Sequence, residues 1–106
     1  MDGTASAQVI FSYMPIEVFL DKRITLEQLR VLGALFSFRG KDSNTVFPSR
    51  KAIAKRCGMH QSNISTATTA LERLGWLTKI GKGGFSKATR YTITVPETVA
   101  DSATVG

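Results

Sequence analysis

Six polar side chains lie close together in the middle of the sequence, and each can both donate and accept hydrogen bonds. They are Gln61, Ser62, Asn63, Ser65, Thr66 and Thr69. The amides of Asn and Gln can pair bidentately with adenine, and the hydroxyls of Ser and Thr can contact several base edges. A solvated helix face is the plainer explanation for such a set. Ser, Thr and Asn are poor helix formers where Glu, Lys or Ala would ordinarily stand, which favours contact with bases.

Apolar residues indicate that these side chains belong to the second of two helices joined by a tight turn. Between residues 49 and 75, two groups of apolar residues recur at helical spacing. They are Ile53, Ala54 and Cys57, followed by Ile64, Ala67, Leu71 and Leu74. Gly58 lies between the groups, where a residue with positive φ can end the first helix, so the second begins at His60 or Gln61. The spacing across Gly58 predicts a helix-turn-helix.

A helix that begins at Thr25 is predicted to be the scaffold behind this motif. Thr25 and Gln28 match a capping box, and Gly40 is a natural stop. The apolar arc of this helix is wide and consists of Leu26, Leu29, Leu32, Leu35, Phe36 and Phe38. Upstream, residues 9–14 have the β-branched and aromatic content of a short strand, which could pair with a later hairpin or form an interface with a second copy. Residues 16–20 are predicted to form a helical turn.

After residue 75 the pattern changes to the alternation of a β-hairpin. The apolar positions are Trp76, Leu77 and Ile80, then Tyr91, Ile93 and Val95. A glycine-rich segment, 81–87, separates these runs and lacks the spacing of a phosphate-binding loop, so no nucleotide site follows. Before the motif, residues 41–45 are predicted to be a loop. An extended pair, 46–47, then leads through Pro48 to Ser49, the expected N-cap of the next helix.

Positive charge is concentrated in the second half of the chain. The formal net charge is +6, yet the five acidic and five basic residues of 1–42 cancel. Residues 43–96 contain one acidic residue, Glu72, and nine basic residues. Such a field suits a polyanion, although a basic face kept for solubility is the plainer explanation. We predict phosphate contacts from the first motif helix and the hairpin through Ser49, Arg50, Lys51, Lys55, Lys82, Lys87 and Arg90.

The sequence contains no recognisable catalytic or metal-binding group. Cys57 and His60 are three residues apart, but no carboxylate or third ligand accompanies them. We therefore expect no enzymatic activity, no cofactor and no metal. A single cysteine allows no internal disulfide, and no apolar run has the length of a membrane span or of a signal peptide. The expected location is the cytoplasm, in association with the nucleoid.

The predicted order of elements resembles a winged helix. The run FPSRKAIAKRCGMHQSNISTATTALERLGWL, preceded by PIEVFL and by the helix from Thr25, is similar to winged helix-turn-helix domains of bacterial and phage replication proteins. Replication proteins of the phage O type and plasmid initiators contain such domains. The likeness covers about residues 13–95. This chain departs from the pattern at His60, where Ser or Thr often caps the helix, and it lacks an arginine near the start of the second motif helix.

The resemblance implies an α+β fold, mainly α, with three helices and a C-terminal β-hairpin wing. We predict a disordered N-terminus (1–8), one winged-helix DNA-binding domain (9–96) and a disordered tail or linker (97–106). The expected function is sequence-specific binding of double-stranded DNA, in replication initiation or transcriptional regulation of a phage or plasmid-type element. A homodimer or other replication proteins are further expected partners. The alternative is a winged helix that serves as a protein–protein interaction module.

Overall fold

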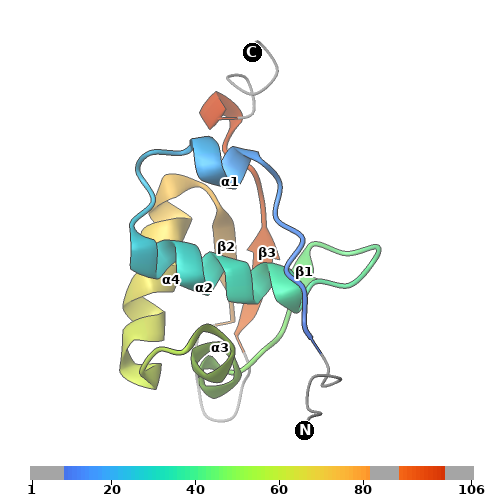
Figure 1. Ribbon diagram of the computed structural model, residues 1–106, viewed down its shortest axis with the longest axis vertical. Helices are drawn as coiled ribbons and strands as arrows, with labels where there is room; N and C mark the ends of the chain where they lie inside the picture. Colours follow the sequence, from blue (N-terminus) through green and yellow to red (C-terminus); the bar gives the residue numbers. More distant parts are fainter. Residues whose placement is uncertain (1–8, 82–88, 100–106) are drawn as a thin grey trace, which may run out of the picture.

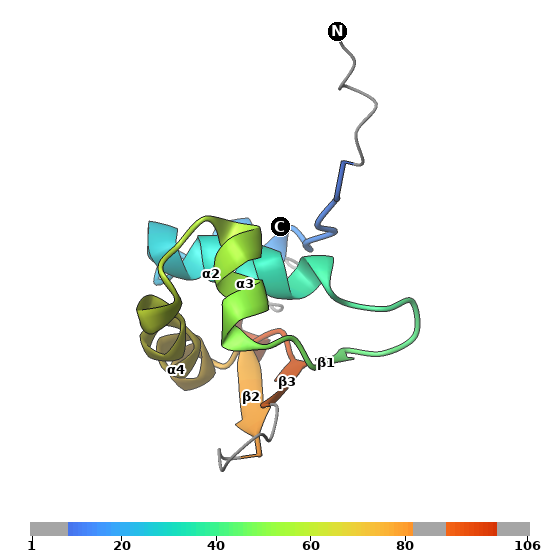
Figure 2. The same ribbon diagram turned by 90° about the horizontal axis from the view of Figure 1, so that it is seen from below.

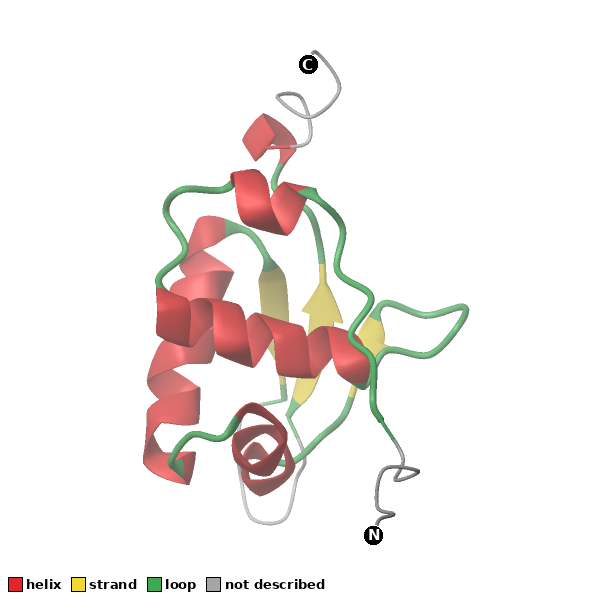
Figure 3. Ribbon diagram, viewed as in Figure 1, coloured by secondary structure: helices red, strands yellow, loops and turns green. Residues whose placement is uncertain are grey.

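The chain folds into helices packed against a small antiparallel sheet (Figure 1, Figure 3). The computed structural model describes residues 9–81 and 89–99. In this part of the chain the helices and strands follow one another as α1, α2, β1, α3, α4, β2 and β3. Lys82, Lys87 and the terminal segments 1–8 and 100–106 lie outside the described residues, so what the sequence predicts for them stays a prediction.

α1, Glu17–Leu20, is one turn long, and a short loop connects it to α2, Leu26–Ser37. The capping box predicted for α2 is confirmed. The Gln28 N–H donates to Thr25 Oγ1 at 3.2 Å, and the Thr25 N–H donates to Gln28 Oε1 at 3.1 Å. The prediction that Gly40 ends this helix is wrong. The helix ends two residues earlier, at the C-cap Phe38, whose backbone N–H bonds to carbonyls of the last turn.

α3, Arg50–Cys57, and α4, Ile64–Leu74, form the predicted helix-turn-helix. Gly58 ends α3 with a φ of 69°, in the left-handed region that favours glycine. A 3₁₀ turn, Gln61–Asn63, comes before α4, so the α-helix begins later than predicted. His60 caps this turn even though it is neither Ser nor Thr, since its Nδ1 accepts a hydrogen bond from the backbone N–H two residues further on at 3.2 Å.

The sheet contains the predicted hairpin and a third strand that the sequence did not predict. β2, Leu77–Ile80, pairs with β3, Arg90–Ile93, and β1, Thr45–Val46, pairs with the other edge of β3. The strand order is therefore β1-β3-β2. β3 ends before Val95, which is 38% exposed although alternation predicted it on the core face. α4 lies beside β2, and β1 lies on the far side of β3 (Figure 1, Figure 2).

Residues 9–14 do not form the predicted strand. β1 occupies the edge of β3 where this segment could have paired, and the segment instead packs across α2 without regular secondary structure (Figure 1). Ser12 Oγ donates to the carbonyl of Gly33 at 2.6 Å, and Met14 packs against the core. Contacts with a helix therefore override the β propensity of these residues.

The ordered structure extends past residue 96. Residues 97–99 form a helical turn, in which the Val99 N–H donates to the carbonyl of Pro96 at 3.1 Å. Val99 belongs to the hydrophobic core and is 8% exposed. The prediction of a disordered tail is therefore wrong for residues 97–99, because burial of an apolar side chain stabilises this turn.

Side chains from all of these helices and strands meet in one core. Its largest fully buried side chains include Trp76, Tyr91, Leu32, Leu35, Ile53, Ile64 and Leu71. Three main helices, of which the last two form a helix-turn-helix, are followed by a β-hairpin that joins a three-stranded sheet. The fold is therefore the predicted α+β winged helix-turn-helix.

Candidate nucleic-acid interface

The outer face of α4 and the 3₁₀ turn before it carry the side chains predicted to contact bases. The inner face of this helix is buried and consists of Ile64, Ala67, Thr68 and Leu71. Thr66 and Thr69 are exposed, and Ser65 beside them is half-buried. Gln61 and Ser62 are exposed in the 3₁₀ turn before the helix. Because the apolar stripe of α4 is fixed in the core, its polar stripe must face solvent.

Asn63 lies where its amide is not used in capping. It is the N-cap residue of α4, yet its side chain makes no capping hydrogen bond. The residue is exposed and lines a cavity of 170 Å³ with Thr66 of α4 and with Thr25 and Gln28 at the start of α2. The donor and the acceptor of this amide therefore remain available for a base edge on the α2 side of the helix.

α3 carries the predicted cations Arg50, Lys51 and Lys55, of which Arg50 lies near α4. Arg50 lines a groove of 540 Å³ together with Ser65 of α4. Lys51 and Lys55 are exposed. Ser49 Oγ accepts a hydrogen bond from a first-turn backbone N–H at 3.0 Å, so Ser49 is the predicted N-cap of α3. Its own O–H proton stays available for a phosphate oxygen.

Among the residues of the wing predicted to contact phosphate, Arg90 is the one that the structure describes. It begins β3 and is exposed, and its guanidinium carbon lies 5.5 Å from the centre of the Phe47 ring. Such a cation–π contact holds the guanidinium close to the segment that leads into α3. Lys82 and Lys87, the other two predicted wing contacts, lie outside the described residues.

Two charged residues that the site prediction omitted lie in the groove between α4 and β2. Lys79 Nζ donates to Thr69 Oγ1 at 2.9 Å, and the Lys79 backbone N–H donates to Glu72 Oε2 at 3.0 Å. Burial lowers the pKa of the Lys79 ammonium, Glu72 opposes this effect, and Arg50 adds to it. Strand alternation could have located Lys79, because it lies two residues after the buried Leu77 and so shares its side of the strand.

Other arginines are engaged in holding α2 and α3 together. Arg30 Nε donates to the carbonyl of Cys57 at 3.1 Å. Arg56 Nη1 donates to Ser37 Oγ at 2.8 Å, and its guanidinium carbon lies 4.0 Å from the centre of the Phe38 ring. The position of positive charges therefore does not by itself identify the surface that would contact DNA, because some of the arginines stabilise the fold.

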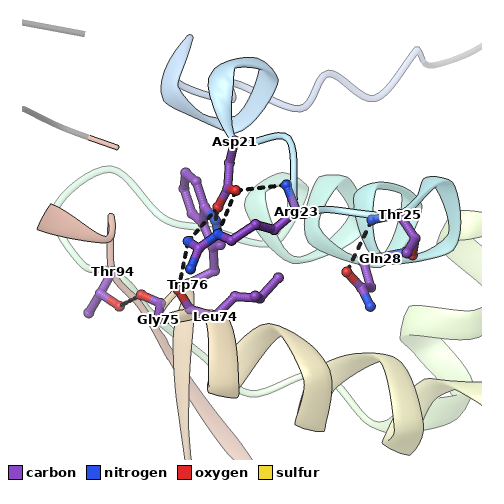
Figure 4. Close-up of polar contacts among 8 residues, drawn as sticks. All are labelled: Asp21, Arg23, Thr25, Gln28, Leu74, Gly75, Trp76 and Thr94. Carbon is purple, nitrogen blue, oxygen red and sulfur yellow. Dashed lines mark hydrogen bonds and ion pairs between the residues drawn. The ribbon is translucent and has the colours of Figure 1, made fainter. Parts of the chain in front are cut away.

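A buried carboxylate fixes the C-terminal end of α4 against the α1–α2 loop (Figure 4). Asp21 accepts hydrogen bonds from Trp76 Nε1 at 2.7 Å and from Arg23 Nε and Nη2 at 2.8 Å each. Arg23 Nη2 also donates to the carbonyl of Leu74 at 3.2 Å. The pKa of Asp21 is lowered from 3.8 to about 2, chiefly by the hydrogen bond from Arg23, with burial opposing the shift and Trp76 adding to it. These contacts hold α4 in place where the chain turns into the wing.

Within residues 9–81 and 89–99, no group of three or more His, Cys, Asp or Glu side chains is arranged to hold a metal ion. No helix of those residues is long and apolar enough to cross a membrane. Cys57 is a buried core residue, as predicted, and its thiol donates to the carbonyl of Ala54 at 3.8 Å. Burial raises the pKa of this thiol, which favours the inert neutral form over the thiolate.

A family model for the helix-turn-helix domain matches residues 22–77, more than half of the chain. The protein therefore belongs to this family of helix-turn-helix domains, a class that binds DNA through the second helix of the motif. The matched region includes all of α2, α3 and α4. A search of curated proteins and a search of solved structures each found no significant match.

Proposed function

We propose that this chain binds double-stranded DNA at specific sequences, with α4 in the major groove. The observation that carries the proposal is the outer face of α4 and of the 3₁₀ turn before it, which presents exposed hydroxyl and amide groups. No acidic residue occurs between positions 61 and 71, so this part of the helix does not repel a polyanion. The major groove admits an α-helix and offers a distinct pattern of donors and acceptors for each base pair.

Cations on neighbouring elements supply the contacts that position the protein. Lys51 and Lys55 on α3 and Arg90 on the wing are exposed, and we assign them to backbone phosphates. Lys82 and Lys87 extend this assignment to the rest of the wing. Phosphate contacts fix the register of a protein on the duplex, whereas contacts with base edges provide the sequence preference.

The biological role that we propose is replication initiation or transcriptional regulation of a phage or plasmid-type element, in the cytoplasm with the nucleoid and without catalysis. Its support is the resemblance of residues 47–77 to domains of replication proteins. An initiator would bind repeated sites beside an A·T-rich segment, whereas a regulator would bind a short palindrome as a symmetric dimer. Selection of bound fragments from genomic and random DNA distinguishes these arrangements.

The salt dependence of binding tests the proposed contact with DNA. If about four to six cations contact phosphates, log affinity should fall against log salt with a slope of about −4 to −5. Fluorescence anisotropy of a labelled duplex, titrated at several salt concentrations between about 50 and 200 mM, measures this slope. Binding that is absent, or that does not weaken with salt, would contradict the proposal.

Exposed apolar side chains in the N-terminal segment favour a second function, that of a protein-interaction module. Val9, Phe11 and Tyr13 are 70%, 64% and 80% exposed, and the rings of Phe11 and Tyr13 stack with centroids 6.2 Å apart. The partner that we propose is a second copy of this chain. Residues 9–16 carry no charge, so a two-fold arrangement can bring the same patch from both copies together without repulsion.

A further inference from the structure

A groove of 540 Å³ is bounded by the start of α3, by α4 and by the sheet. β2 is the edge strand next to α4, because the strand order is β1-β3-β2 (Figure 1). Arg50 of α3, Ser65 and Glu72 of α4, and Lys79 and Tyr91 of the sheet line the groove. Side chains from α3, α4 and the sheet therefore face the same groove.

The side chain of Lys79 reaches α4 from the sheet. Its Nζ donates to Thr69 Oγ1 at 2.9 Å. Its backbone N–H lies on the free edge of β2 and donates to Glu72 Oε2 at 3.0 Å. Two residues of α4 thus hold one residue of the wing strand. An ammonium group has three N–H donors, so donors remain on Lys79 for an anion in the groove.

The charges of the groove favour one anionic group. Arg50 and Lys79 come from different elements and face the same hollow, against the carboxylate of Glu72. Glu72 only partly offsets the effect of burial, which lowers the pKa of Lys79. A phosphate oxygen beside Lys79 would supply further negative charge, and it would also lie within reach of the Arg50 side of the groove.

The position of the groove matches the path of a DNA backbone. A helix in the major groove is flanked on both sides by phosphate backbones, and the wing of this fold lies next to α4. A backbone that runs between α4 and the wing would therefore pass over Lys79.

We propose that this groove binds a backbone phosphate of DNA through Lys79 and Arg50, and that Thr69 positions Lys79. The inference rests on the proposed DNA-binding function and assigns the contacts within that site. Thr69 then acts through Lys79 and not by contacting a base, which differs from the role that its exposure on α4 predicted. Because Thr69 holds the ammonium before DNA arrives, less side-chain entropy is lost on binding.

Substitution of the lysine tests the phosphate contact. Binding is measured by anisotropy on a duplex selected for tight binding and on an unrelated duplex, over a range of salt concentrations. Lys79→Gln should weaken both complexes about tenfold at about 50 mM salt and reduce the slope of log affinity against log salt by about one. Lys79→Arg keeps the charge and should retain the slope of the original chain.

A double-mutant cycle tests the role of Thr69. Thr69→Val removes the hydroxyl that accepts from Lys79 and keeps the shape of the side chain. It should weaken both duplexes by the same factor, about two- to fivefold, and it should cost nothing further when combined with Lys79→Gln. Thr66→Val is the matched control on the same helix face, and it should weaken binding chiefly to the selected duplex. Thermal unfolding of every variant shows whether it is folded.

The outcomes separate this inference from the function on which it rests. Failure of the original chain to bind any duplex would overturn the proposed function itself. An original chain that binds, together with a Lys79→Gln variant of unchanged slope or a Lys79→Arg variant of reduced slope, would overturn the phosphate assignment alone. Thr69→Val would overturn the positioning role if it altered sequence preference and cost the same affinity with or without Lys79→Gln.

Discussion

Asp21 shows how a single side chain fixes the position of the proposed recognition helix. It joins the loop before α2 to Trp76, which is fully buried at the start of the wing, and to Arg23, which also contacts the last turn of α4. Its side chain is 2% exposed, whereas that of Arg23 is 48% exposed. The carboxylate is therefore shielded from water. Its stability in this position depends on the charge of Arg23 and on the hydrogen bonds from Arg23 and Trp76.

Replacement of this carboxylate should destabilise the fold. Asp21→Asn keeps an oxygen that can accept from Trp76 but does not balance the charge of Arg23. We expect the free energy of unfolding to fall by about 2 kcal/mol, from the lowered pKa of Asp21 and the value of a pKa unit. Urea denaturation at neutral pH measures this, and Asp42→Asn, in an exposed loop, is the matched control.

The same substitution should flatten the acid end of the stability curve. The folded pKa of Asp21 is below its ordinary value, so its contribution is present above about pH 3.8 and is lost as the pH falls through about 2. The stability of the original chain should thus decrease more steeply than that of Asp21→Asn between these two values. Equal slopes for both proteins would contradict the assigned role.

Among the helices and strands, the helix-turn-helix depends on the left-handed backbone conformation of Gly58. Its φ of 69° closes α3, and Met59 N–H bonds back to the carbonyl of Ala54 at 3.0 Å. A Cβ at Gly58 would lie 2.9 Å from Nη2 of Arg30, whose Nε holds the last carbonyl of α3. A larger residue would therefore strain the turn and disturb the contact between α2 and α3.

Gly58→Ala is expected to lower the free energy of unfolding by about 1 to 2 kcal/mol, because L residues disfavour the left-handed region. Gly40→Ala is the matched control, since a Cβ there would meet no atom within 4 Å. Its effect should stay within about 0.5 kcal/mol of zero. Thermal and urea unfolding of both variants compare the two sites, and equal losses would show that the turn does not require glycine.

The elements that the sequence predicted correctly are those set by nearby residues. The capping box at Thr25, the N-cap Ser49 and the turn at Gly58 depend on side chains and backbone within a few positions. β1 could not be predicted in this way, because it consists of Thr45–Val46 and depends on pairing with residues far along the chain. Residues 9–14 have strand propensity, but β1 occupies the edge of β3 with which they could have paired.

The sequence predicted which side chains of α4 face solvent but not the contacts that they make. Helical periodicity correctly placed Thr66 and Thr69 on the outer face of α4. It could not show that Thr69 accepts a hydrogen bond from Lys79, because that contact depends on how the wing packs beside α4. It also gave no sign that Arg56 stacks on Phe38 and so belongs to the fold.

At the scale of the whole molecule, the proposed DNA-binding surface and the exposed apolar segment lie apart. In both Figure 1 and Figure 2, α4 is at one side of the domain and the N-terminal segment is at the other. Contact between two copies through residues 9–14 would thus leave α4 of each copy free. Two recognition helices could then contact two half-sites of one DNA molecule.

Self-association through this segment should depend on its exposed aromatic rings. Phe11→Ser combined with Tyr13→Ser removes the stacked pair, and neither residue is buried. We expect the original chain to be a dimer in sedimentation equilibrium at micromolar concentration and the double variant to be a monomer with an unchanged midpoint of thermal unfolding. An original chain that is monomeric, or a double variant that still dimerises, would exclude this interface.

In the proposed function, α4 provides sequence preference while cations on the neighbouring elements provide affinity for any DNA. Asn63 is the test residue on the helix, since its exposed amide makes no capping bond. Lys82, in the glycine-rich sequence between β2 and β3, is its proposed counterpart among the phosphate contacts. Base edges carry sequence information and phosphates do not, so the two substitutions should differ in kind.

The most direct measurement is the ratio of affinities for a selected duplex and an unrelated duplex, determined for the original chain, Asn63→Ala and Lys82→Ala. Asn63→Ala should cost about 1 to 3 kcal/mol on the selected duplex with little change on the other, so the ratio falls. Lys82→Ala should weaken both complexes alike and lower the salt slope by about one, so the ratio is kept. The proposed role of α4 is contradicted if Asn63→Ala weakens every duplex equally while Lys82→Ala alone changes which sequence is preferred.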